Sequence, residues 1–341
     1  MAQCLALGAD TQHREVTVLP RLNYYRRIAA AYLTPLQSQL DFWHEPPEVN
    51  PEAAPSELGE YYMPFTRKAD YAGVYDEQGV PMLNYRGTLG VQYNPIAIAQ
   101  YGLGNYNLYR KTDDSRRREK FLTAANWLVS HQERNPAGLS VWNHHFDWEY
   151  RTPLKAPWYS GLAQGQGISL LVRAHQATGD DRYLSAAKES FNTFLAAPDK
   201  GGVTYVDEAG DIWFEEYVIF PPTHILNGFI WASWGVFDFY LATASAEAKD
   251  LFTRAVQTLA GNLSRYDAGF WSLYEQSGTR MKMLASPFYH SLHIVQLKIL
   301  HKLTGHEIFS RFAQKWDAYR LDRQNRVRAR IQKSIFKLCY Y

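Results

Sequence analysis

A helix–turn–helix–hairpin unit recurs along this chain, and the repeat constrains its fold more than any other feature. Long apolar segments with helical periodicity begin near Asn94, Ser160, His224 and Phe288, at spacings of 66, 64 and 64 residues. After a short turn, each is followed by a more amphipathic helix, as expected for a helix with one solvent face. These second helices are expected at 115–134, 181–196, 246–265 and 306–319. The sequence therefore predicts a mainly α fold, an incomplete (α/α) toroid of about four inner–outer helix pairs.

The segments between helix pairs predict β-hairpins at one rim of this toroid. They are rich in Trp, Tyr and turn residues, and lie at 138–150, 201–217 and 267–276. Inner helices of a toroid run in one direction, so their N-termini open on the rim to which the hairpins return. Glu216, Tyr217 and Tyr274 end two hairpins, and Tyr289 opens the fourth inner helix. We expect these groups at one mouth, although ordinary half-buried tyrosines and a hairpin carboxylate are the alternative in a chain with 24 Tyr.

The rest of the chain divides into an N-terminal extension and a basic C-terminal tail. Residues 1–90 should contain a short helix at 23–33, a Pro-rich linker at 46–60 and a β-hairpin within 61–85. Residues 91–320 form the predicted toroid, which would be the catalytic domain. Residues 321–341 form the tail.

Composition excludes several classes of function. The chain has 341 residues, 46% of them hydrophobic, so it can bury a large core. A formal net charge of +2 gives no reason to expect a nucleic-acid partner. Cys4 and Cys339 are too few for a disulfide framework. We find neither an apolar leader nor a run of 18 apolar residues, so we expect a soluble, cytoplasmic protein.

Several segments resemble the catalytic C-terminal domain of the D-glucuronyl C5-epimerases. These enzymes convert glucuronate to iduronate within heparan-type polymers. The similarity extends over roughly residues 90–320, in the family's order and with nearly its spacings. The matching segments are 126–129, 156–166, 213–217, 226–229, 265–274 and 289–297.

The resemblance implies an isomerase that acts on an acidic polysaccharide such as heparosan. Inverting C5 of a uronate needs a base on one face, an acid on the other and stabilisation of an enolate-like intermediate, so no cofactor is required in principle. By resemblance, Glu216 and Tyr289 serve the two faces, Tyr274 assists at the carboxylate and Tyr217 positions the ring. The implied substrate-binding residues are Trp158, Tyr159, Ser160, Gln164, Gln166, Asn227, Arg280, His290 and His293.

The sequence departs from the family in ways that concern charge and metal. The family has an arginine three residues after the tyrosine that matches Tyr274, whereas this chain has Ser277, so Arg280 or Lys282 would have to substitute. Family members bind calcium through a β-rich part, and a structural calcium ion is kept as an expectation. His290 and His293 have the spacing of one helical face but no obvious third ligand, so no metal is assigned to them.

Two other functions stay open at this point. A polysaccharide lyase on a similar toroid would begin from the same proton abstraction, and a hydrolase on such a toroid is the other enzyme that stays open. A non-catalytic glycan-binding module would use the aromatic side chains and would not need Glu216 or Tyr289. A homodimer is also left open.

The basic tail permits two interpretations. Residues 315–341 carry eight Lys and Arg against two Asp, with Ile331, Ile335, Phe336 and Leu338 interleaved among the later basic residues. The segment is either a solvated terminal helix or an amphipathic segment that lies on an anionic membrane, at its inner face. In the second case, deleting 321–341 should abolish vesicle binding and leave activity on soluble polymer unchanged.

Overall fold

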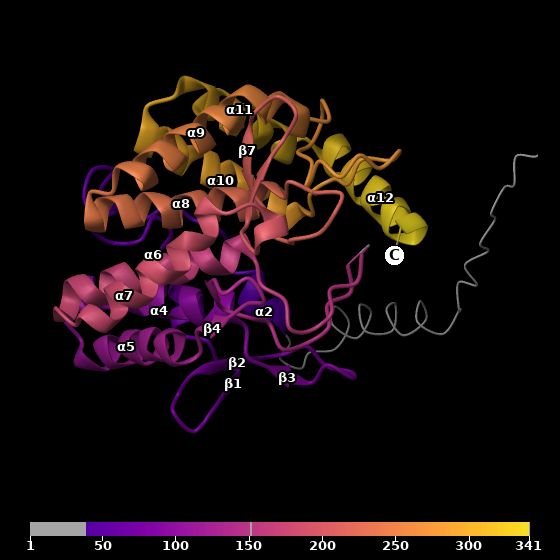
Figure 1. Cartoon of the computed structure of the whole chain (residues 1–341). Coiled ribbons are helices and arrows are strands. Elements are labelled where there is room, and N and C mark those ends of the chain that lie inside the picture. The colour runs from indigo at the N-terminus through magenta and orange to yellow at the C-terminus, as the bar shows by residue number, and fades with distance from the viewer. Residues whose placement is uncertain (1–38, 151, 341) are drawn as a thin grey trace, which may run out of the picture. The chain divides into compact units, whose positions relative to one another are not determined.

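The computed structural model describes residues 39–150 and 152–340 of the chain (Figure 1). The helix predicted at 23–33 lies outside the described residues. Four inner helices begin within two residues of the predicted positions and alternate with four outer helices. The inner helices are α4 (Pro95–Thr112), α6 (Gly161–Thr178), α8 (Leu226–Thr243) and α10 (Pro287–Thr304). The outer helices are α5 (Ser115–Ser130), α7 (Asp181–Phe191), α9 (Ala246–Asn262) and α11 (Glu307–Leu321).

These helices form the predicted incomplete toroid. Each inner helix packs on the outer helix that follows it, and α4, α6, α8 and α10 are neighbours in that order. Local sequence sets where three of the four begin, because Asn94, Ser160 and Ser286 accept hydrogen bonds from the first free backbone N–H groups of α4, α6 and α10. The mainly α fold class and the toroid are thus confirmed.

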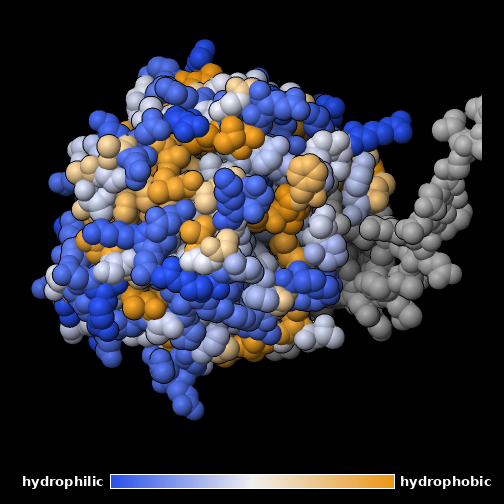
Figure 2. Space-filling view, viewed as in Figure 1, coloured by the Kyte–Doolittle hydropathy of each residue, from blue (hydrophilic) through white to orange (hydrophobic). Residues whose placement is uncertain are grey.

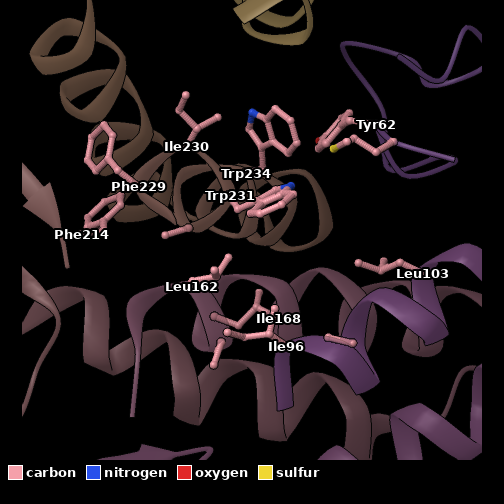
Figure 3. Packing of buried hydrophobic residues seen from close by; sticks show 14 of the residues in the cluster. Tyr62, Ile96, Leu103, Leu162, Ile168, Phe214, Phe229, Ile230, Trp231 and Trp234 are labelled. Atoms are coloured by element: carbon pink, nitrogen blue, oxygen red, sulfur yellow. The ribbon is translucent and has the colours of Figure 1, made fainter. Parts of the chain in front are cut away.

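Small residues allow the inner helices to approach closely. A Cβ added at Gly235 of α8 would lie 2.2 Å from the carbonyl oxygen of Gly165 on α6, and one added at Gly165 would lie 2.6 Å from Cα of Ala232. No larger residue fits at this crossing without separating the helices. Figure 3 shows apolar side chains of both helices, with Ile230, Trp231 and Trp234 on α8 and Leu162 and Ile168 on α6. All five are buried.

Of the three predicted hairpins, the second forms an antiparallel ladder within its predicted segment 201–217, whereas the first is shifted toward the N-terminus and pairs residues 133–134 with 140–141. β4 (Glu133–Arg134) pairs with β5 (Ser140–Val141), and β6 (Thr204–Val206) pairs with β7 (Ile212–Phe214). The third segment has only isolated bridges, Asp267 with Ser272 and Leu273 with Leu284. The first two outer-helix predictions ran long: α5 ends at Ser130, and η1 (Asn192–Leu195), a 3₁₀ turn, follows α7. A 3₁₀ turn, η3 (Leu263–Tyr266), likewise follows α9.

The region before the toroid is only partly the predicted hairpin. It contains α2 (Gln39–Trp43) and α3 (Thr66–Ala69), and then the strands β1 (Val74–Tyr75), β2 (Pro81–Asn84) and β3 (Val91–Gln92), in the order β1-β2-β3. The first half of the segment 61–85 is therefore not strand. It packs instead on the inner helices, where Tyr62 donates a 2.7 Å hydrogen bond to Asp238 of α8, which also pairs with the buried Arg173 of α6.

The basic tail forms helix α12 (Arg323–Tyr340), which lies beside the loops that follow α9 (Figure 1). Ala329 and Phe336 are buried, whereas Val327, Ile331 and Ile335 are exposed. Figure 2 shows that hydrophobic and hydrophilic residues are interspersed on the face in view. Over the described residues, no helix is both long enough and apolar enough to cross a bilayer.

Candidate active site

Two adjacent glutamates follow β7, and the structure gives them different surroundings. Successive side chains of an extended segment point to opposite faces. Glu215 accepts hydrogen bonds from the backbone N–H groups of Thr223 (3.2 Å) and His224 (3.1 Å), and its Oε1 lies 2.5 Å from Nδ1 of His224. Its side chain therefore fixes the loop that leads into α8. Glu216 points the other way, toward the first turn of α8.

The Glu216 carboxyl group is buried against the start of α8. A Cβ added at Gly228 would lie 2.2 Å from Oε2 of Glu216, so this carboxyl group can occupy its position only because residue 228 is glycine. Asn227 donates from Nδ2 to the same oxygen over 3.4 Å. Burial, and next the negative charge of Glu275, raises the pKa of Glu216 to about 8. The group can therefore both hold and release a proton near neutral pH.

The phenols predicted at the rim come together around this carboxyl group. The rings of Tyr274 and Tyr289 meet edge to face, with their centroids 5.0 Å apart. Tyr217 and Tyr289 pack against a buried cluster that contains Tyr274 and Ile225. Burial, and next the charge of Glu216, raises the pKa of Tyr274 well above its usual value of 10, which keeps this phenol protonated. The four residues Glu216, Tyr217, Tyr274 and Tyr289 thus bring a carboxyl group and three phenols to one place.

The hairpin after α5 covers the same cluster with further aromatic rings. Trp148 donates from Nε1 to the Tyr217 hydroxyl over 3.1 Å, and the rings of Tyr150 and Tyr217 are 4.7 Å apart. Trp158 also reaches Tyr217, at 5.8 Å between ring centroids, and it stacks on His144 at 3.8 Å. Trp158 is half-buried, as is Tyr159 beside it. These two predicted binding residues therefore lie at the edge of the site.

A second buried carboxyl group was missed by the sequence reasoning. Glu275 follows Tyr274 directly, is 2% exposed, and accepts a hydrogen bond from the Tyr150 hydroxyl. Its charge is the second cause of the raised pKa of Glu216. The Tyr-Glu dipeptide at 274–275 mirrors the Glu-Tyr dipeptide at 216–217, and this pairing was the only signal in the sequence that could have pointed to it.

Five predicted binding residues are instead enclosed in the core. Ser160, Gln164, Gln166, His290 and His293 have no exposed surface. Ser160 caps α6, Gln164 accepts from Ser190 of α7, and Gln166 donates to Tyr61. His290 and His293 both lie within 3 Å of the Ser272 hydroxyl. In this structure these side chains are bonded within the core, and their role in substrate binding stays a prediction.

The positive charge expected near Tyr274 comes from a different element. Arg280 and Lys282 both lie exposed in the loop before α10. Lys333 of α12 instead places its Nζ 5.4 Å from the centroid of the Tyr274 ring, and Phe336 of the same helix packs against that tyrosine. The tail is therefore part of the wall of the site. The expectation that its deletion leaves activity unchanged does not agree with this packing.

The described residues contain no group of three or more His, Cys, Asp or Glu side chains that could hold a metal ion. The structural calcium ion implied by the family resemblance stays a prediction. Asn227 lies in the first turn of α8, next to the Glu216 carboxyl group. Its buried Oδ1 has no hydrogen-bond partner among the described residues. This oxygen is available to accept a hydrogen bond from a hydroxyl group.

Fold and site together define an (α/α)-toroid protein with a buried carboxyl group among phenols at one rim. The comparisons with known proteins make the class more specific. Residues 137–318 match the family described as D-glucuronyl C5-epimerase C-terminus. The chain belongs to this family.

Individual relatives agree with this assignment. The chain is 31% identical over 214 residues to the D-glucuronyl C5-epimerase of Caenorhabditis elegans, a match that covers 58% of this chain and 34% of that enzyme. It is 29% identical over 255 residues to an uncharacterized protein of Methanocaldococcus jannaschii, covering 69% of this chain and 81% of the relative. The chain thus spans about a third of the nematode enzyme.

One solved structure supports the fold alone. Cellobiose 2-epimerase from Spirochaeta thermophila superposes with a TM-score of 0.50 over 91% of this chain and 88% of its own, at 11% identity.

Proposed function

We propose that this protein is a polymer-level hexuronate C5-epimerase that converts D-glucuronate to L-iduronate residues in a heparosan-like polysaccharide. The observation that carries the proposal is the buried Glu216 carboxyl group, held on Gly228 beside Tyr217 and Tyr274, with Tyr289 next to them. Family membership supports the reaction class. The substrate and the roles of the residues are our inference.

The proposed reaction exchanges one proton at one carbon. A base removes the C5 proton, and the electron pair of the C–H bond moves into the carboxyl group to give an enolate-like intermediate. An acid on the opposite face then returns a proton to C5, so that no other bond of the sugar breaks. Glu216 and Tyr289 are the proposed pair. A carboxyl group with a pKa of about 8 suits this task, because it delivers a proton below that pH and accepts one above it.

Tyr274 and Asn227 have supporting roles in this proposal. Tyr274 stays protonated, so its hydroxyl can donate a hydrogen bond to the carboxyl group of the sugar as negative charge develops there. Asn227 holds Glu216 through Nδ2, and its unpartnered Oδ1 can accept from a sugar hydroxyl. The half-buried Trp158 and Tyr159 offer ring faces to neighbouring sugars of the polymer.

Incubation of the protein with heparosan in deuterated water tests this function. We expect deuterium at C5 of the uronates, with the length of the polymer unchanged, and exchange from either epimer. Shorter, unsaturated products would instead identify a lyase, which expels the C4 substituent after the same proton abstraction. Binding without exchange would identify a glycan-binding module and contradict the proposal.

A further inference from the structure

Helix α12 presents a polar residue on a face that is otherwise used for packing. Ala329, Lys333, Phe336 and Tyr340 recur at intervals of four, three and four residues, which places them on one side of the helix. Ala329 and Phe336 are buried, and the Tyr340 hydroxyl accepts a 3.2 Å hydrogen bond from the backbone of Met281. Lys333 thus lies in the middle of the surface through which α12 attaches to the toroid.

Lys333 is half-buried at this position, where its ammonium charge costs free energy unless an acceptor or a negative charge compensates it. Its ammonium group lies 5.4 Å from the centre of the Tyr274 ring, and the Tyr289 ring lies against the same tyrosine at 5.0 Å. Among the described residues, Leu284 provides the only hydrogen-bond acceptor, its carbonyl oxygen, at 2.7 Å from Nζ. An ammonium group has three N–H donors, so two stay available.

The surroundings of Lys333 favour a negatively charged ligand. Burial, and next the charge of Lys337, lowers the pKa of Lys333 to about 7, while the charge of Glu275 raises it. The phenol of Tyr274 and the imidazole of His293 are also near Lys333. Burial raises the pKa of Tyr274 and lowers the pKa of His293, so both groups are neutral at neutral pH and neither supplies a negative charge. The negative charge of a bound carboxylate would therefore stabilise the protonated, positively charged form of Lys333, which burial disfavours.

We propose that Lys333 is the cationic group of the site, which binds the carboxylate of the hexuronate and stabilises the negative charge that develops on it. This inference rests on the proposed function. It also gives α12 a part in substrate recognition, although this helix follows the residues that match the family. Arg280 and Lys282, the sequence-based candidates for this charge, are both exposed. A cation beside the carboxylate matters most in the transition state, when the enolate-like charge accumulates.

The first test compares two ligands and two variants. The ligands are a heparosan tetrasaccharide and the same tetrasaccharide with its uronates reduced to neutral glucose. Lys333→Met should weaken binding of the acidic ligand by about 10- to 100-fold, the range expected for one charge-assisted hydrogen bond, and leave binding of the neutral ligand unchanged. Arg330→Met removes the same charge from an exposed position of α12 and should change neither.

A second measurement needs no change at Lys333 and applies even if that variant does not fold. In Glu216→Gln, which removes the other group of the site whose pKa lies near neutral pH, affinity for the acidic tetrasaccharide should fall as pH rises from 6 to 9, while affinity for the neutral ligand stays constant. Equal affinities of Lys333→Met and the wild type for the acidic ligand, or a flat pH profile, would overturn the assignment of Lys333. If the wild type neither binds the acidic tetrasaccharide nor exchanges its C5 proton, the proposed function itself fails.

Discussion

Replacing Glu216 by Gln should remove part of the pH dependence of the stability of this protein. The folded-state pKa of Glu216, about 8, lies above the value of 4.5 for the unfolded chain. The stabilisation that comes from keeping this group protonated is therefore complete below pH 4.5 and is lost as pH rises toward 8. Gln has nearly the size of the neutral acid, is also polar and uncharged, and cannot ionise.

The magnitude follows from the shift. A raised pKa of this size makes the wild type lose about 2 to 3 kcal/mol of unfolding free energy between pH 5 and pH 7 relative to Glu216→Gln. Gly228 leaves no room for the carboxyl group to move into α8, and Asn227 is the partner that it keeps at that helix. The loss is therefore not expected to be relieved by a small rotation of the side chain.

Urea unfolding followed by tryptophan fluorescence at pH 5 and pH 7 measures this difference. The wild type should lose stability relative to Glu216→Gln on going to pH 7. Glu119→Gln removes a carboxylate from an exposed position on α5 and serves as the matched control. If wild type and Glu216→Gln respond to pH in parallel, the carboxyl group is not held in the buried environment described above, and the acid–base argument built on it fails.

Three further predictions concern activity, packing and location. Tyr289→Phe should abolish C5 deuterium incorporation without changing the urea midpoint, because it removes a proton-transfer group at almost constant volume; normal exchange would remove Tyr289 from the acid–base pair. Phe336→Ala should cost about 3 to 5 kcal/mol locally and lower exchange activity, because the ring is buried against Tyr274; full activity of this variant or of a chain ending at residue 320 would show that α12 is independent of the site. If the exposed residues Val327, Ile331 and Ile335 of α12 lie on an anionic membrane, the protein should sediment with anionic vesicles at low salt. Ile331→Asp should abolish this sedimentation. A variant that sediments like the wild type would exclude these residues as the membrane contact.

The sequence by itself determined the repeat and therefore the toroid. The spacing of apolar helices, the capping residues Asn94 and Ser160 and the small residues at the inner helices are local or periodic features, and each acts through its immediate neighbours along the helix or across one helix crossing. The convergence of Glu216, Tyr217, Tyr274 and Tyr289 followed from the same regularity, because segments that occupy equivalent places in a repeat reach the same rim.

Only the tertiary structure decided which side chains are free to act there. The resemblance selected Glu216, but the physical reason that Glu215 is engaged elsewhere lies in the Thr223 and His224 backbone groups, which the loop before α8 brings back to Glu215. Four polar residues of the family motifs form hydrogen bonds within the core: Gln164, Gln166, His290 and His293. The sequence pattern alone cannot distinguish a polar side chain in the core from one that lines a binding groove. Lys333 reaches Tyr274 from a helix outside the repeat, and no periodicity in the sequence specifies where such a helix docks.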